Sequence, residues 1–137
     1  MELKGAQLCF KHLQEKEIPI KVFVSDQHKG VAKWIRESFS STTHYFDQWH
    51  IAKNITKKMF AASKQRGCEL ISDWIAAVRN HIYWCCTSTK EGFQTMILAK
   101  WKSLVQHMSD NHTGHPDVLF PKCAHDDSIE QREWIKK

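Results

Sequence analysis

The sequence predicts an α/β fold that is rich in helix. Apolar residues recur at helical spacing along most of the 137-residue chain, and 42% of the residues are hydrophobic, which is enough for a packed core. Two short runs of β-branched and aromatic residues, near positions 20 and 43, interrupt the helical pattern. From about residue 67 onward only helical patterns remain, so we expect a small α/β part followed by an all-helical part.

The first four predicted elements alternate between helix and strand. The spacing predicts a helix over residues 3–16, which Pro19 follows, and the next apolar run predicts a strand over residues 20–26. Ser25 and Asp26 are favourable N-cap residues for a second helix. The apolar stripe of this second helix consists of Val31, Trp34, Ile35 and Phe39.

A second strand over residues 43–47 leads into a predicted helix over residues 48–64, which we expect to stop near Gly67. Two strands alone form a sheet of little independent stability. Either further strands that pair with this sheet lie outside this chain, in which case we expect self-association through its open edge, or the helices carry the fold.

The remaining elements are helical. A nearly apolar helix is predicted over residues 69–86, and Ser88 with Glu91 resembles a capping box for the next helix. After Ser109 a loop with several His and Asp residues follows, and a short helix is expected over residues 129–136.

Charge is distributed unevenly along the chain. The net charge is +5, with a balance of +6 over residues 1–67 and −1 over residues 68–137. This asymmetry indicates an anionic partner such as nucleic acid, or alternatively a lysine-rich surface exposed only to solvent. The five cysteines are irregularly spaced, which favours reduced thiols or a metal site over a disulfide framework. No stretch resembles a signal peptide or a membrane span, so we expect no membrane partner.

Asp26 stands at the carboxyl end of the first predicted strand, where ligands gather in open α/β sheets. A carboxylate there suits Mg²⁺, which prefers oxygen ligands. The alternative is that Asp26 only caps the following helix. Asp47 and His50 lie three residues apart where the second strand turns into a helix, so Asp47 either orients His50 behind a metal site or simply caps the helix.

The ordered run Val22-Phe23-Val24-Ser25-Asp26, a helix, and then His44-Tyr45-Phe46-Asp47-Gln48-Trp49-His50 resembles the middle of cut-and-paste DNA transposases with an RNase H-like core. In Mutator-, hAT- and Kolobok-like transposases, a strand-terminal Asp is followed by an Asp-x-x-His or Cys-x-x-His motif. Asn80 to Cys85 and Lys100 to Ser103 also resemble the helical insertion of transposase-derived proteins.

The resemblance implies a partial RNase H-like core over residues 1–66 and a helical insertion region with a His/Cys-rich loop over residues 67–137. It implies Asp26 as a catalytic Mg²⁺ ligand, DNA as the partner and a nuclear location. A two-metal site needs several converging carboxylates, and among late residues only Glu130 and Glu133 are candidates. We therefore expect a transposase-derived chain that is inactive by itself, or alternatively a non-enzymatic DNA- or protein-binding module.

A late group of four residues has ligand types that zinc prefers: His107, His112, Cys123 and His125. Two pairs, His-x4-His and Cys-x-His, lie within 19 residues, in a segment with little apolar content of its own. They predict a zinc site, with surface histidines and one buried thiol as the alternative. His81 and Cys85, one helical turn apart, fit core packing better than a ligand pair.

The predicted helix after His50 is basic. Lys53 and Lys57 lie one turn apart with Lys58 beside them, a pattern that suits contacts to the DNA backbone. The alternative is a helix face exposed only to solvent.

Overall fold

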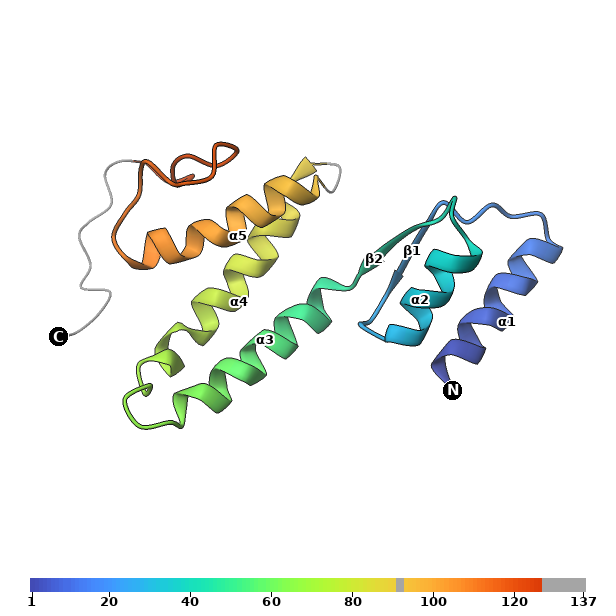
Figure 1. The fold of residues 1–137 in the computed structure, drawn as a ribbon, viewed down its shortest axis with the longest axis horizontal. Helices are drawn as coiled ribbons and strands as arrows, with labels where there is room; N and C mark the ends of the chain where they lie inside the picture. Colours follow the sequence, from blue (N-terminus) through green and yellow to red (C-terminus); the bar gives the residue numbers. More distant parts are fainter. Residues whose placement is uncertain (91–92, 127–137) are drawn as a thin grey trace. The chain divides into compact units, whose positions relative to one another are not determined.

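The computed structural model describes residues 1–90 and 93–126, which contain five helices and a two-stranded sheet (Figure 1). In chain order the elements are α1 (Glu2–Glu15), β1 (Val22–Ser25), α2 (Lys29–Ser38), β2 (Thr43–Phe46), α3 (Gln48–Ser63), α4 (Ile71–Thr87) and α5 (Gln94–Met108). The chain divides into two compact units, Met1–Ile55 and Thr56–Lys137, so the boundary falls within α3. None of the helices in the described part of the chain is long and apolar enough to span a membrane.

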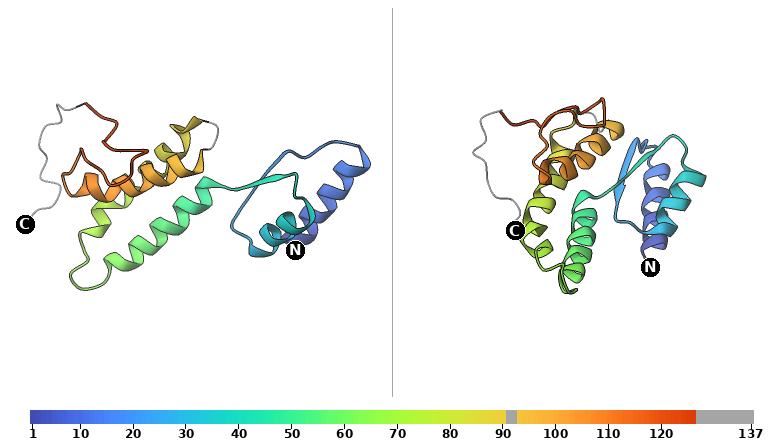
Figure 2. Two further views of the ribbon diagram at one scale, coloured as in Figure 1. Left: turned by 45° about the horizontal axis from the view of Figure 1, so that its top comes forward. Right: turned by 60° about the vertical axis from the view of Figure 1, so that its left-hand side comes forward.

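The first unit is built around a parallel β–α–β arrangement. β1 pairs with β2 in parallel, with Val22 opposite Thr43 and Ser25 opposite Phe46, and α2 forms the connection between them. Helices α1 and α2 lie side by side, as Figures 1 and 2 both show. Parallel neighbours need such a crossover, and their carboxyl ends therefore meet at one edge of the sheet.

Aromatic rings form the core of this unit. Phe10 of α1 is 2% exposed, and its ring meets three others edge-on with centroid distances of 4.7–5.1 Å. These rings belong to Phe23, Trp34 and Phe39. On the other face of β1, Val22 and Val24 are each 56% exposed. The alternation of side chains along a strand thus places the apolar contacts of the sheet on one face.

The second unit contains the helical hairpin of α4 and α5. Its buried side chains include Val78, Ile82, Cys85 and Leu104. Lys100 is also buried, and its ammonium group donates to Ser88 O, Ser88 Oγ and Thr89 Oγ1 at 2.9–3.1 Å. These contacts compensate the cost of burying a charged group and hold the end of α4 against α5.

The order of helices and strands up to residue 108 confirms the sequence prediction of a helix-rich α/β chain. Two predicted caps were wrong. The N-cap of α2 is His28, whose Nδ1 accepts from Val31 N at 3.2 Å. Ser88 is the C-cap of α4 rather than the start of α5, because its hydroxyl donates back to the carbonyl of Trp84. Glu91, Glu130, Glu133 and the predicted helix 129–136 lie outside the described residues.

Candidate metal centre

The loop after α5 folds back on itself and forms the scaffold of the centre. His107 lies in the last turn of α5, and His112 follows just after the helix ends at Met108. An isolated antiparallel bridge then joins Thr113 to Lys122, and Cys123 N donates to the carbonyl of His112 at 2.9 Å. The bridge places the two ends of a ten-residue loop side by side. This explains how side chains that are distant in sequence come close together.

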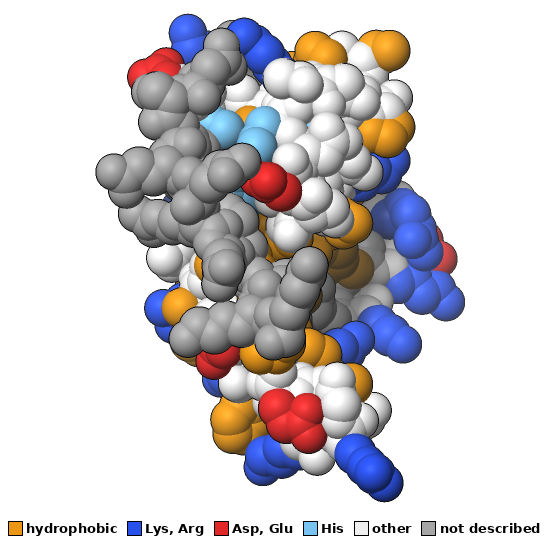
Figure 3. Space-filling model, turned by 90° about the vertical axis from the view of Figure 1, so that its left-hand side faces the viewer, with side chains coloured by type: hydrophobic (Ala, Val, Ile, Leu, Met, Phe, Trp, Pro, Cys, Tyr) orange, Lys and Arg blue, Asp and Glu red, His pale blue; other side chains and the backbone are white. Residues whose placement is uncertain are grey.

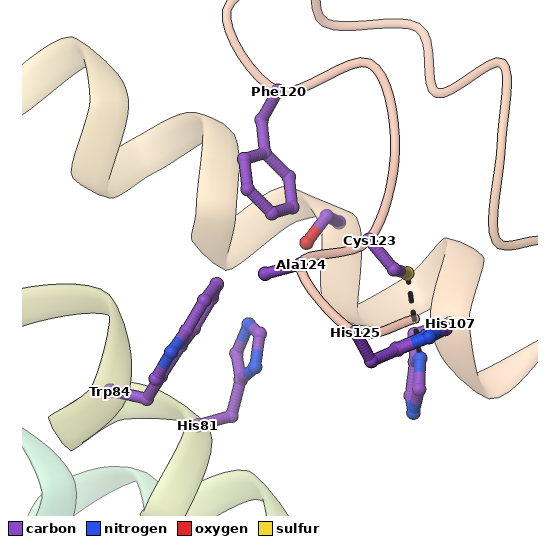
Figure 4. A pocket seen from close by; sticks show the side chains of 8 residues that line it. His81, Trp84, His107, Phe120, Cys123, Ala124 and His125 are labelled. Atoms are coloured by element: carbon purple, nitrogen blue, oxygen red, sulfur yellow. Dashed lines mark hydrogen bonds between the residues drawn. The ribbon is translucent and has the colours of Figure 1, made fainter. Parts of the chain in front are cut away.

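Four side chains converge at this point: His107, His112, Cys123 and His125. Their ligand atoms all lie within 4.8 Å of one another. Figure 4 shows His107, Cys123 and His125 together, with the Cys123 Sγ–His107 Nδ1 contact of 3.5 Å as a dashed line. Tetrahedral zinc with its usual bond lengths separates its ligands by about 3.4–3.6 Å. The cluster can therefore hold a metal ion such as Zn²⁺ with a contraction of about 1 Å.

Two of the histidine rings have their second nitrogen held by an acceptor. His112 Nε2 lies 3.0 Å from Asp110 Oδ1, and His125 Nδ1 lies 3.0 Å from the carbonyl oxygen of Asp126. Carboxylate and carbonyl oxygens only accept, so both of these nitrogens carry protons, and in neutral rings the opposite nitrogens carry lone pairs. Those opposite nitrogens, His112 Nδ1 and His125 Nε2, face each other at 3.2 Å. Two facing lone pairs repel each other, and a cation between them removes that repulsion.

The environment of the metal-free centre favours the neutral forms of His107 and Cys123. Burial, followed by the charges of His112 and His125, lowers the pKa of His107, while burial raises the pKa of the Cys123 thiol. A neutral imidazole is the form that binds a metal, whereas the thiol must lose its proton to do so. Metal binding at this centre is therefore expected to release a proton from Cys123.

The sequence did not single out His115, which lies beside Cys123 and contacts the backbone of the loop that carries the cluster. It is 7% exposed, and its Nδ1 and Nε2 lie 3.2 Å and 3.1 Å from the carbonyl oxygens of Phe120 and Asn111. The same Nε2 lies 3.7 Å from Cys123 Sγ. His115 thus links the two ends of the loop and lies next to the sulfur of Cys123. Its position within the His/Cys-rich loop was the only sequence signal for this role.

A cavity of about 330 Å³ opens beside the centre. His81 and Trp84 of α4 and Phe120 of the loop line its apolar side, as Figure 4 shows. His107, Cys123 and His125 border it on the other side. Figure 3 shows histidine side chains reaching the surface together in one place. His107, His112 and His125 are each partly exposed, so the centre is accessible to an ion from solvent.

In the first unit, Asp26 and Asp47 directly follow the two parallel strands. Asp47 N donates to the carbonyl of Ser25 at 2.7 Å, which places both acidic residues at one sheet edge. Asp26 Oδ1 accepts from His28 N at 3.1 Å and Asp47 Oδ1 accepts from Trp49 N at 3.0 Å. Asp47 Oδ2 also lies 3.8 Å from His50 Nε2. Within the described residues, neither carboxylate belongs to a group of three or more metal ligands.

The three basic residues proposed for DNA contact, Lys53, Lys57 and Lys58, lie on α3 with exposed side chains. Lys53 Nζ stands over the ring of Trp49, 4.7 Å from its centroid. His81 Nε2 donates to the carbonyl oxygen of Lys100 at 2.8 Å and Cys85 is buried, which fits the expected core packing of this pair.

Comparison of the chain with protein families, with curated proteins and with solved structures found no match.

Proposed function

We propose that the second unit carries a structural zinc site formed by His107, His112, Cys123 and His125. The facing nitrogens of His112 and His125, 3.2 Å apart with their opposite nitrogens held by acceptors, are the observation that carries this proposal. Three nitrogens and one sulfur are a ligand set that zinc favours over Mg²⁺ or Ca²⁺. Four protein ligands leave no open position, which is typical of structural rather than catalytic zinc.

The role of such a site is to fix a segment that has few other restraints. Residues 109–126 contain one isolated bridge and no helix or longer strand. Zinc binding contributes directly to folding when the ligands come together only in the folded state. The loop would thereby be held against the end of α5.

Metal analysis tests this proposal. We expect about one zinc per chain after purification without chelators, and cobalt substitution should give the visible bands of a tetrahedral site with a thiolate charge-transfer band. Cys123→Ser should remove the charge-transfer band, and His112→Ala should weaken zinc binding. Cys68→Ser is the matched control, because Cys68 is a free cysteine outside the cluster. Zinc below about a tenth of an equivalent in carefully purified protein would contradict the proposal.

A second candidate function concerns the whole chain. We propose that it derives from a DNA transposase with an RNase H-like core, with Mg²⁺ as the cofactor of that core, DNA as its partner and the nucleus as its location. The parallel β–α–β arrangement with Asp26 and Asp47 at one sheet edge supports this proposal. Two carboxylates are few for a two-metal reaction, so the chain by itself is proposed to bind DNA without cutting it.

Cleavage and binding assays separate these roles. We expect salt-sensitive retention of duplex DNA and no Mg²⁺- or Mn²⁺-dependent cleavage by the isolated chain. Cleavage that disappears in Asp26→Asn would instead identify an active nuclease. Failure to retain DNA at low salt would contradict the proposed DNA partner.

A further inference from the structure

One side of α3 combines exposed aromatic rings with lysines. Trp49 and Phe60 are 49% and 55% exposed, and they lie eleven residues apart, which is close to three full turns. Both rings therefore point to nearly the same side of the helix. Lys53 and Lys64 each follow a ring by four residues and place their ammonium groups 4.7 Å and 4.6 Å from the ring centroids. Together with Lys57, these residues form what we term the aromatic–basic face.

The charged residues of α3 and of the turn that follows it are all basic. Between Gln48 and Cys68 there are five Lys or Arg residues and no Asp or Glu. The segment contrasts with α4, which begins with an acidic residue in its first turn. An acid-free helix of this kind is complementary to an anionic polymer.

The spacing of the two rings suits a short stretch of nucleic acid strand. Eleven residues correspond to about 16 Å along a helix axis. About five stacked nucleotides at about 3.4 Å each occupy the same length. Lysines beside each ring, and between the rings, are then positioned for the phosphates of the same strand.

We infer that the aromatic–basic face of α3 binds single-stranded nucleic acid, with Trp49 and Phe60 stacking on bases and the neighbouring lysines contacting phosphates. The inference rests on the proposed interaction with DNA and names the form of DNA that this helix prefers. In a duplex the base faces are already stacked, so exposed rings gain nothing there, whereas a single strand offers its base faces.

A bilayer surface fits this face less well. Helices that lie in a membrane interface bury a continuous apolar face and keep their lysines on the opposite side. On α3, lysines stand over both rings, so insertion of Trp49 and Phe60 into lipid would bury Lys53 and Lys64 with them. Desolvating those charges is costly.

Fluorescence anisotropy with the full, zinc-loaded chain tests the inference. Labelled oligothymidine is the single-stranded probe, a hairpin duplex is the second probe, and both are titrated at several salt concentrations. Trp49→Leu combined with Phe60→Leu should weaken oligothymidine binding by about 10-fold or more and leave duplex binding nearly unchanged. Lys53→Gln with Lys57→Gln should weaken both and reduce the salt dependence of both.

Phe46→Leu with Phe93→Leu is the matched control, since both rings are exposed but lie outside α3. Equal binding of oligothymidine by the Trp49/Phe60 variant and the native chain would overturn the inference while leaving the proposed duplex interaction intact. Absence of binding to either probe would contradict the proposed DNA interaction as well. Binding to phosphatidylcholine–phosphatidylserine vesicles in preference to oligothymidine would also overturn the inference.

Discussion

The histidines of the second unit show how a partly buried imidazole makes stability depend on pH. Burial lowers the pKa of His81, against a smaller opposing effect of its hydrogen bond to the carbonyl of Lys100. The pKa of His107 is lowered too, first by burial. In both cases the unfolded chain binds a proton more readily than the folded one. Stability is therefore fully present above the ordinary histidine pKa, about 6.5, and is lost as pH falls below it.

For the metal-free protein we accordingly expect the free energy of unfolding to fall between pH 7.5 and pH 5. Urea unfolding at several pH values measures this dependence. His81→Gln keeps a side-chain N–H for the Lys100 carbonyl but cannot titrate, so its stability should vary less with pH than that of the native chain. His12→Gln serves as a control, because His12 is exposed on α1. An identical pH dependence of the native chain and His81→Gln would contradict this account.

At the same scale, the sequence predicted all four residues of the metal cluster but not the groups that hold them. Ligand types can be read from a sequence because zinc accepts few side chains. The supporting role of Asp110 and His115 depends on the turn after α5 and on the bridge between Thr113 and Lys122, which place those side chains beside the ligands. No local pattern encodes that bridge, so it could not be predicted.

At the scale of elements, the periodicity of apolar residues predicted the helices well, whereas the two predicted helix caps were wrong. The stripe of Val31, Trp34, Ile35 and Phe39 reflects packing repeated over several turns, and these residues do lie in or against the core of the first unit. A helix end depends on a single contact instead. Asp26 binds the amide of His28, and His28 rather than Asp26 then caps α2. Both residue types can cap, so only the backbone path decides between them.

The end of α4 illustrates the same limit. Ser88 carries the residue type that begins many helices, yet here its hydroxyl binds the carbonyl of Trp84 and Lys100 binds Ser88 in turn. The buried lysine comes from the neighbouring helix α5, twelve residues later. A contact between helices thus holds Ser88 at the end of α4, which a reading of α4 alone could not predict.

At the scale of the whole molecule, the two units are stabilised by different means. The first unit buries a cluster of rings around Phe10 between two helices and a sheet. The second combines a helix pair with a loop in which polar side chains, chiefly histidines, take the place of an apolar core. Removing a metal should therefore affect the second unit and spare the first.

Hydrogen exchange measured by mass spectrometry tests this separation on the full chain. After chelation we expect amides of the loop to lose protection, especially Cys123 N and His115 N, which donate to backbone carbonyls across the loop. Amides of α1 and of the sheet, such as Asp47 N, should exchange at unchanged rates. Cys123→Ser should reproduce the effect of the chelator and Cys68→Ser should not. Loss of protection in α1 to the same extent as in the loop would show that the two units unfold as one, and an unchanged loop would show that the ion does not hold it.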